Sequence, residues 1–224
     1  MKVSHLSICL LGAIQASAQD PSDCSSGGGL PAAEFVLEDQ GDSSYHASLA
    51  GIFSDAGKVV TVGDVFANAN HKLTSASGGM KAWPAGDFDD QNTAKWIPQG
   101  ISSTADALGA GTIDGVDGLL TSWYREDGDS ARVTFVNKAD YSYRHVLLVY
   151  PFANDDFREV PIHAGGLMWY GNTLWVVDTW NGIRVFDMSN IWQVTTGTGT
   201  DAVGKQSDGT YTAAGYKYVL PQIR

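Results

Sequence analysis

The sequence lacks the features shared by most nucleic-acid-binding and membrane-spanning proteins. Lysine and arginine total 14 against 25 aspartate and glutamate residues, a formal net charge of -11 at pH 7. Such a chain repels phosphate backbones, and no basic patch in the sequence offsets the repulsion, so nucleic acid is not an expected partner. No run of residues reaches the roughly 20 apolar positions that a membrane-spanning helix requires, so we expect no membrane partner either.

Cysteine is almost absent, and its placement accords with secretion. Lys2, the apolar run Leu6–Ile14 and a small-residue cleavage site are typical of a signal peptide, which we assign to residues 1–18. Its removal takes Cys9 away and leaves Cys24 alone, so the mature chain has no intramolecular disulfide. The sequence therefore predicts a secreted, extracellular protein.

The segment after the signal peptide has few apolar side chains. Residues 19–31 are rich in serine and glycine and predict a disordered tail. Cys24 lies in this tail and is either a free thiol, a thiol paired with another chain, or an incidental residue. The sequence also lacks an Asn-x-Ser/Thr site, so N-glycosylation is not expected.

Short apolar runs separated by turn residues dominate the rest of the chain. Three such runs follow one another, Leu167–Tyr170, Leu174–Val177 and Ile183–Phe186, with Gly171-Asn172 and Asn181-Gly182 at the joins. Asn-Gly between strands favours a type I′ hairpin, in which both central residues have positive φ. The pattern predicts an antiparallel meander, the building unit of a β-propeller blade.

Similar runs predict further strands, at Gly118–Tyr124, Ala131–Val136 and Tyr143–Tyr150. Pro151 is expected to end the last of them, because proline cannot donate to a strand ladder. Upstream, Gly51–Phe53 and Lys58–Val62 flank a turn-rich tetrapeptide and predict a hairpin. No long segment shows helical periodicity.

An imperfect internal repeat sets the expected fold class. Gly100-Ile101 and Gly166-Leu167 open two units with the same order of glycine, strand, turn and strand, and their Arg-Val pairs recur at a spacing of about 50 residues, typical of propeller blades. We therefore expect an all-β, propeller-like repeat of antiparallel four-stranded blades over residues 32–224. So few blades leave the ring incomplete, which predicts an unpaired edge on the C-terminal side unless the chain dimerises.

Several motifs resemble one family of uncharacterised secreted proteins from filamentous fungi and actinobacteria. The motifs are Trp96–Ile101, Tyr143–Val149, His163–Leu167, Arg184–Asp187 and Tyr218–Gln222. The resemblance implies a propeller-like secreted protein and no particular activity. Members usually continue well past the Leu-Pro-Gln motif, so it also implies that this chain is a short variant or a truncated one.

Polar residues beside the expected inner strands are the candidate binding residues. Gln99 and His163 occupy equivalent places in the repeat, and Asp178, Trp180 and Asn181 surround one strand end. A propeller gathers such residues at the mouth of its channel, where they bind a ligand or a calcium ion through oxygen ligands. The alternative is that Gln99 and His163 cross-link neighbouring blades by hydrogen bonds. Two further polar candidates are Asp106 and His145.

Calcium is the one cofactor that the sequence allows, and the support for it is slight. Glu126–Asp129 and Asp87–Asp90 are Asp-rich turns that could chelate calcium or could be plain solvated turns. The pattern of short strands and turns resembles that of six-bladed calcium-dependent lactonases and gluconolactonase-like hydrolases. These enzymes carry an acidic residue where this chain has Gln99. Zinc, Walker, Rossmann and Gly-x-Ser-x-Gly patterns are all missing.

The seven tryptophans decide between the two candidate functions. Trp123 and Trp175 lie inside strands and are expected in the core. Trp83 and Trp180 lie beside turns and are the candidates for stacking on sugar rings, although packing of the turn against a neighbour is the favoured expectation for both. Because aromatic side chains outnumber convergent carboxylates, we expect an extracellular binding protein for a small molecule or a glycan. The alternative is a calcium-dependent, lactonase-like hydrolase with its site at the channel mouth.

Overall fold

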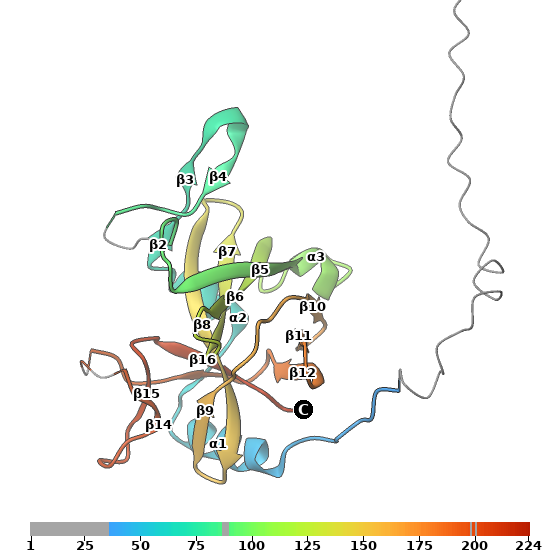
Figure 1. Cartoon of the computed structure of the whole chain (residues 1–224), viewed down its shortest axis with the longest axis vertical. Helices are drawn as coiled ribbons and strands as arrows, with labels where there is room; N and C mark the ends of the chain where they lie inside the picture. Colours follow the sequence, from blue (N-terminus) through green and yellow to red (C-terminus); the bar gives the residue numbers. More distant parts are fainter. Residues whose placement is uncertain (1–35, 87–89, 198, 200) are drawn as a thin grey trace, which may run out of the picture. The chain divides into compact units, whose positions relative to one another are not determined.

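The fold is mostly β and is organised around one large sheet (Figure 1). The computed structural model describes residues 36–86, 90–197, 199 and 201–224. The predicted signal peptide (1–18), the predicted tail (19–31) and Cys24 lie outside these residues. Within the described part, Asp39–Arg224 forms one structural unit.

The large sheet has nine strands among the described residues, in the order β1-β13-β16-β8-β7-β6-β5, with β2 and β9 pairing on β8. Its strands are β1 (Val59–Val60), β2 (His71–Lys72), β5 (Trp96–Ser103), β6 (Gly118–Arg125), β7 (Ala131–Asn137), β8 (Ser142–Ala153), β9 (Asp156–Glu159), β13 (Ile191–Gln193) and β16 (Tyr218–Pro221). All pairs are antiparallel except β16 with β8.

Smaller elements surround this sheet. The strands are β10 (Leu167–Tyr170), β11 (Thr173–Asp178) and β12 (Gly182–Asp187) in a three-stranded sheet, and the hairpins β3 (Thr74–Ser75) with β4 (Lys81–Ala82) and β14 (Val203–Lys205) with β15 (Tyr211–Ala213). The helices are α1 (Ser44–Asp55), α2 (Val62–Ala67), α3 (Thr104–Ala107) and the 3-10 turn η3 (Ser77–Gly79). No helix in the described part is both long and apolar enough to cross a membrane.

Strand β8 separates two hydrophobic cores. Val146 and Leu148 belong to the larger core, which also holds the meander residues Trp169 and Phe186. The alternate residue Leu147 belongs to a second core beneath α1. Because successive side chains of a strand point to opposite faces, one strand can serve both cores. The same alternation places His145 on the face of Leu147, where the candidate site lies.

The four-stranded blades predicted from the sequence are not found among the described residues. The sheets there have nine, three, two and two strands, and they do not repeat one unit around an axis. The two segments that look alike in sequence differ in their partners: β6 and β7 continue into β8 and the large sheet, whereas β11 and β12 end in a sheet of three. The local hairpins are thus as predicted, and their assembly is not.

The predicted unpaired edge on the C-terminal side is also wrong. The last strand, β16, lies inside the large sheet, antiparallel to β13 on one side and parallel to β8 on the other. Beyond it, the Ile223 amide donates to the Val185 carbonyl at 2.8 Å. In the strand order of the large sheet, the two end strands are β1 and β5 instead.

The predicted N-terminal hairpin is a helix and its cap. Gly51–Phe53 belongs to α1, which buries Leu49 and Phe53 one turn apart. Gly57 has a φ of 63° and follows the helix, while the Lys58 amide bonds to the Phe53 carbonyl at 2.8 Å. This geometry is that of a Schellman cap, a helix C-terminus that ends in a glycine with positive φ. In the sequence, the same glycine looks like the turn of a hairpin.

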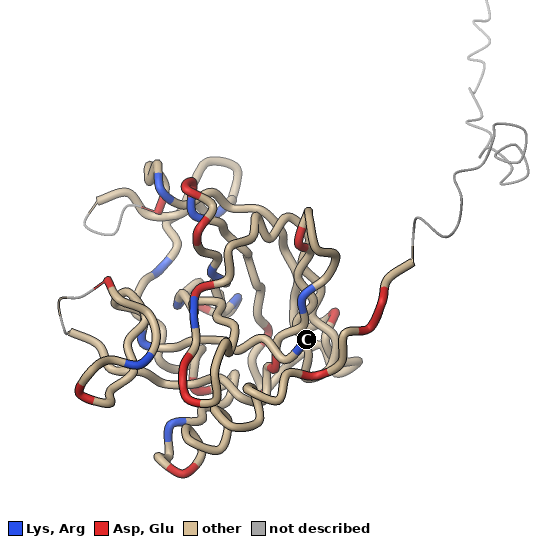
Figure 2. Tube along the Cα trace, turned by 60° about the horizontal axis from the view of Figure 1, so that its bottom comes forward, with Lys and Arg blue, Asp and Glu red and all other residues tan. Residues whose placement is uncertain are grey.

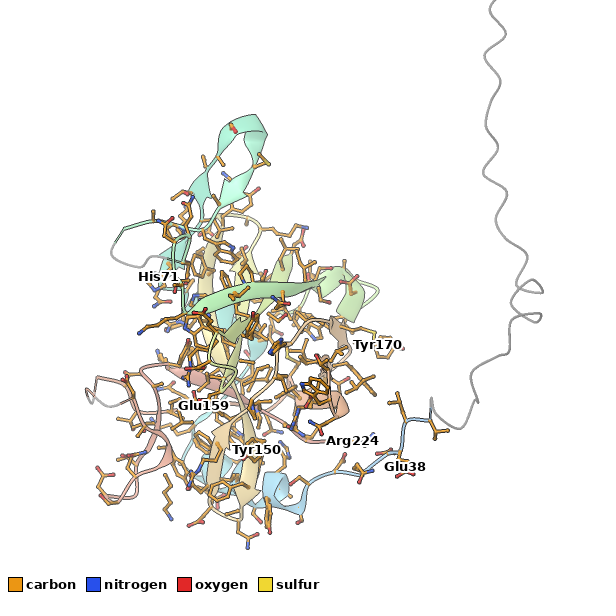
Figure 3. The ribbon with its side chains drawn as sticks, in the orientation of Figure 1. Glu38, His71, Tyr150, Glu159, Tyr170 and Arg224 are labelled. Carbon is orange, nitrogen blue, oxygen red and sulfur yellow. The ribbon has the colours of Figure 1, made fainter. Side chains whose placement is uncertain are left out.

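The three-stranded meander agrees with the prediction, but its turns differ in detail. Gly171 alone of Gly171-Asn172 has a positive φ, as in a type II′ turn. At the other join Asp178 pairs with Gly182, so the loop has three residues and only Gly182 has a positive φ. The expected type I′ turn at Asn181-Gly182 is therefore wrong. The outward face carries exposed side chains such as Tyr170, which projects from β10 (Figure 3).

Pro151 does not end β8. It pairs with Phe157 of β9, and the register shifts between Pro151 and Ala153 before the strand ends. Such a shift accommodates a residue that has no amide hydrogen to donate.

Gly118 begins β6 at a point of close packing, which gives a testable prediction. A Cβ there would lie 2.4 Å from Cζ of Phe66, a ring that is itself buried and packed edge-on against Phe135. We expect Gly118→Ala to lower the free energy of unfolding by about 1–3 kcal/mol, as overpacked cores do. Gly109→Ala, where nothing lies within 4 Å, is the matched control in a urea titration. Equal midpoints for the two variants would contradict the packing argument.

Candidate functional site

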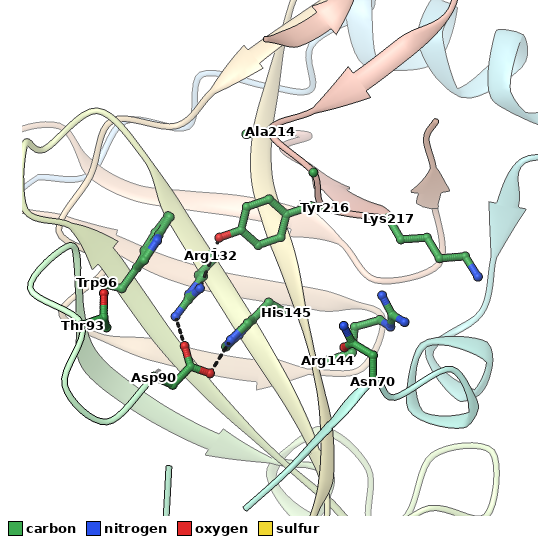
Figure 4. A pocket seen from close by; sticks show the side chains of 11 residues that line it. Asn70, Asp90, Thr93, Trp96, Arg132, Arg144, His145, Ala214, Tyr216 and Lys217 are labelled. Carbon is green, nitrogen blue, oxygen red and sulfur yellow. Dashed lines mark hydrogen bonds and ion pairs between the residues drawn. The ribbon is translucent and has the colours of Figure 1, made fainter. Parts of the chain in front are cut away.

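A cavity of about 370 Å³ opens beside β7 and β8 (Figure 4). It lies at the lower end of the size range of small-molecule sites, about 300–1,000 Å³. The lining residues come from the residue before β2, the segment before β5 and the first residue of β5, strands β7 and β8, and the loop between β15 and β16. They are Asn70, Asp90, Thr93, Trp96, Arg132, Arg144, His145, Ala214, Gly215, Tyr216 and Lys217.

Asp90 is the centre of a buried hydrogen-bond network at one end of the cavity. Its Oδ1 accepts from Nη2 of Arg132 at 2.8 Å, and its Oδ2 accepts from the Tyr143 hydroxyl at 2.6 Å and from Nε2 of His145 at 2.8 Å. Asp90, Arg132 and His145 are all less than 10 % exposed. A buried charge without a partner is costly, so each of these groups holds the others in place.

The strand register explains why β7 and β8 contribute together. Thr134 and His145 are directly opposite one another in the antiparallel pair. Their side chains therefore lie on the same face, and Oγ1 of Thr134 is 2.6 Å from Nδ1 of His145. The indole of Trp123 on β6 donates to the same hydroxyl at 2.7 Å. The polar network thus crosses three neighbouring strands.

Burial and hydrogen bonding fix the charges in this network. Burial lowers the pKa of His145 to about 4, outweighing the opposing effect of Asp90. Burial alone would raise the pKa of Asp90, but hydrogen bonds from His145 and Tyr143 and the charge of Arg132 bring it to about 2. Near neutral pH His145 is thus neutral and Asp90 ionised. Since an ionised carboxylate only accepts, Nε2 of His145 carries the proton and Nδ1 accepts from Thr134.

Arg132 is held between aromatic rings as well as by Asp90. Its guanidinium carbon lies 4.4 Å from the ring centre of Trp96 and 4.8 Å from that of Trp123. Nη1 donates to the Tyr216 hydroxyl at 3.3 Å. Its Nε is buried and has no hydrogen-bond partner among the described residues. These contacts hold Arg132 rigidly beside Trp96. We call this side of the cavity, formed by Trp96 and Arg132, the aromatic wall.

A strained turn places Tyr216 against this wall. Ala214 and Gly215 have φ values of 48° and 84°, and the Tyr216 amide donates to the Ala213 carbonyl at 2.8 Å. Two successive positive φ values with this hydrogen bond describe a type I′ turn. A non-glycine residue at positive φ costs stability, and such strain is characteristic of binding and catalytic sites. Burial raises the pKa of the Tyr216 phenol, so it stays neutral.

Two cations lie at the other side of the cavity. Arg144 on β8 and Lys217 before β16 both bind Asn68, which ends α2: Nη2 of Arg144 and Nζ of Lys217 lie 3.1 and 2.8 Å from its Oδ1. Nε of Arg144 also donates to the Asn68 carbonyl. In Figure 4 these cations lie apart from Trp96 and Asp90, so the cavity has an aromatic end and a cationic end.

Three of the sequence-predicted site residues lie together, but away from this cavity. Asp178, Trp180 and Asn181 form the turn between β11 and β12. The buried Asp178 accepts from the Trp180 amide, from the Asn181 side chain and from Nε of Arg184 at 2.9–3.1 Å. The Asp178 carboxylate therefore stabilises the turn by hydrogen bonds to neighbouring residues. Trp180 is 89 % exposed, as its place beside the turn predicts.

Gln99 lies within β5, and His163 lies on the segment that leads into the meander at β10. Both are exposed, and Gln99 bonds its own neighbour, the Pro98 carbonyl, at 3.0 Å. His163 stacks on Tyr124 with ring centres 4.4 Å apart. None of the five predicted site residues lines the cavity at Asp90.

The remaining sequence candidates have local roles or belong to the cavity. Asp106 forms the capping box of α3 with Ser103. Asp127 and Asp129 both pair with Arg125 in their own turn. Of the Asp87–Asp90 segment, residues 87–89 lie outside the described part, and Asp90 is the centre of the network. No group of three or more His, Cys, Asp or Glu side chains suited to a metal ion occurs in residues 36–86, 90–197, 199 and 201–224.

Trp123 and Trp83 lie as expected, whereas Trp175, expected in the core, is only half-buried on β11. Trp123 is fully buried, as expected of a strand residue. Trp83, beside Pro84, packs edge-on against Trp123 and Tyr143, with ring centres 4.8 and 5.1 Å away, so the expected packing of this turn residue against its neighbours is the one observed.

Thr134, His145 and Asp90 form a hydroxyl–imidazole–carboxylate chain, the arrangement of groups in many acyl-transfer enzymes. The hydroxyl of Thr134 is fully buried, is already bonded by Trp123, and does not line the cavity. A nucleophile must reach the substrate, and a general base works best with a pKa near the operating pH. The chain therefore has the connectivity of a catalytic triad without its accessibility.

Comparison with known proteins returned no matching family model, no matching curated protein and no matching solved structure.

Proposed function

We propose that this protein is a secreted binding protein that takes a small molecule, or one sugar ring of a glycan, into the cavity between Trp96 and Lys217. The observation that carries the proposal is the combination of a preformed cavity with an aromatic wall and fixed polar groups. Sites of this kind bind rings by stacking and orient them through a few hydrogen bonds.

The state of the titratable groups favours binding over catalysis. Asp90 and His145 have pKa values of about 2 and about 4, both far from neutrality. Every polar atom of Asp90 and of the His145 ring is engaged within the network. A calcium-dependent hydrolase remains the alternative proposal. To bind the calcium ion it would need further carboxylates, in addition to those that already form ion pairs.

The relation to propellers is likewise a proposal. It is supported by the close packing of Gly100 and Leu167, which lie at the start of the two sequence repeats. A Cβ on Gly100 would lie 2.9 Å from Cβ of Leu167. The innermost strands of neighbouring propeller blades are close in the same way. The resemblance to the uncharacterised secreted family and the extracellular location rest on the sequence motifs alone.

Loss of the aromatic wall gives a direct test of the binding site. We expect Trp96→Leu to weaken binding of sugars from a panel of monosaccharides and short oligosaccharides by about fivefold to thirtyfold, because it removes a stacking surface worth about 1–2 kcal/mol. Calorimetry on the mature chain measures the affinity, and thermal unfolding checks that the variant folds.

Trp180→Ala is the matched control, since Trp180 is an exposed tryptophan that belongs to the sequence-predicted site and not to the cavity. Binding lost in Trp180→Ala and kept in Trp96→Leu would move the site to the β11–β12 turn. A wild-type chain that binds no sugar of the panel would contradict the proposal.

A further inference from the structure

Resting on the proposed function, we infer that the ligand carries an acidic group, a carboxylate, sulfate or phosphate on its sugar ring, which binds at Arg144 and Lys217. The cationic end of the cavity is then the specificity determinant, and the aromatic end holds the ring. The proposed ligand class is an anionic carbohydrate.

The cavity is lined by more positive than negative side chains, whereas the whole chain is acidic. The whole chain has a formal net charge of -11, and Figure 2 shows its acidic residues placed mostly at turns. The cavity, in contrast, is lined by Arg132, Arg144 and Lys217 against the single carboxylate of Asp90. Cations gathered in a cleft attract anions and raise their local concentration.

Arg144 differs from every other arginine of the chain. Arg125, Arg132, Arg158, Arg184 and Arg224 each form an ion pair with a carboxylate. Arg144 is half-buried and has no carboxylate within ion-pair distance among the described residues, and the same holds for Lys217. Within the part of the chain that the structure describes, two adjacent cations without a carboxylate partner leave room for an external anion.

The end of α2 explains only part of this arrangement. Arg144 bonds the terminal carbonyl of Asn68, a favourable position for a cation because a helix C-terminus carries a partial negative charge of about half a unit. That partial charge is smaller than the two full positive charges of Arg144 and Lys217. Burial also lowers the pKa of Arg144, against a smaller opposing effect of Tyr218.

Arg132 is excluded as the anion-binding cation by its own contacts. Asp90 neutralises it at 2.8 Å, and the rings of Trp96 and Trp123 are stacked close to its guanidinium. An incoming acid there would lie next to the ionised Asp90. The acidic group is therefore placed at Arg144 and Lys217, and the ring lies toward Trp96 and Tyr216.

Matched sugars that differ in one acidic group test this inference. The probes are D-glucuronate against D-glucose, D-galacturonate against D-galactose, and D-glucose 6-sulfate, each titrated into the mature chain by calorimetry. We expect the acidic member to bind tenfold to a hundredfold more tightly, the usual effect of one or two charge-assisted hydrogen bonds. The preference should shrink as salt is added.

Lys217→Gln should remove most of this preference, while Lys138→Gln, which alters an exposed lysine paired with Asp117, should keep it. Arg144→Gln gives the second variant, and thermal unfolding confirms that each chain is folded. Equal affinity for acidic and neutral sugars would overturn this inference and leave the proposed function standing. Binding of neither kind would overturn both.

Discussion

Asp90→Ala is expected to lower the free energy of unfolding by about 3–5 kcal/mol, the largest effect of any single substitution considered for this chain. The substitution removes one partner of a buried ion pair and leaves Arg132, with 3 % of its surface exposed, as an uncompensated charge. It also removes the hydrogen bonds that the Tyr143 hydroxyl and Nε2 of His145 donate to Asp90. Urea unfolding of the mature chain, extrapolated to zero denaturant, measures the change.

A second substitution separates the charge effect from a simple loss of packing. If the unpaired charge is the cause, Asp90→Ala combined with Arg132→Met should be more stable than Asp90→Ala alone, because the methionine fills the space between Trp96 and Trp123 without a charge. Asp127→Ala, which breaks an exposed pair with Arg125, is the control and should unfold like the wild type. A double variant no more stable than Asp90→Ala would show that the ion pair is not the source of the loss.

The sequence predicts the parts of this fold that depend on neighbouring residues. Short apolar runs with glycine at the joins predict β10, β11 and β12, and the strands β6, β7 and β8 are found where expected. These signals are local, since a hairpin is specified by its own turn and by the pattern of its two strands. The helix α1 was missed because its glycine cap is also a hairpin signal.

The assembly of the strands depends on contacts that no local pattern contains. β16 pairs in parallel with β8, with Val219 opposite Leu147 although many residues separate them in the chain. A parallel pair needs no turn signal, so nothing next to either strand specifies it. The expected propeller follows from treating each hairpin as a blade, which is an inference about assembly from local evidence.

The candidate site was missed for a related reason. Asp90 is separated by 42 residues from Arg132 and by 55 from His145, so no motif links them. Strand β7 alternates Val133 and Phe135 with Arg132 and Thr134, which normally indicates one buried face and one solvated face. Here both faces are buried, and the polar one holds the network. The sequence offers two of these residues as candidates, His145 as a polar residue near a strand end and Asp90 as part of an Asp-rich turn, but nothing in it connects them.

The Asp90 network also predicts that stability falls steeply in mild acid. Burial lowers the pKa of His145 from 6.5 to about 4 in the folded state. Between these two values the unfolded chain binds more protons than the folded chain, so the free energy of unfolding rises with pH and is lost as the pH falls from 6.5 to 4. A shift of this size corresponds to about 3 kcal/mol. Burial also lowers the pKa values of His46 and His71, which act in the same direction.

Urea unfolding at successive pH values between 7 and 4 measures this dependence. His145→Gln removes the titrating ring but keeps a side chain that can donate to Asp90, so its slope should be clearly shallower over the same window. His163→Gln, at an exposed ring stacked on Tyr124, is the matched control and should keep the wild-type slope. Identical slopes for all three chains would mean that His145 is charged in the folded state, and an imidazolium there would pair with Asp90 as a salt bridge. Below pH 4 the lowered pKa of Asp90 extends the loss of stability toward its own value of about 2, because the carboxylate must be protonated before the network is released.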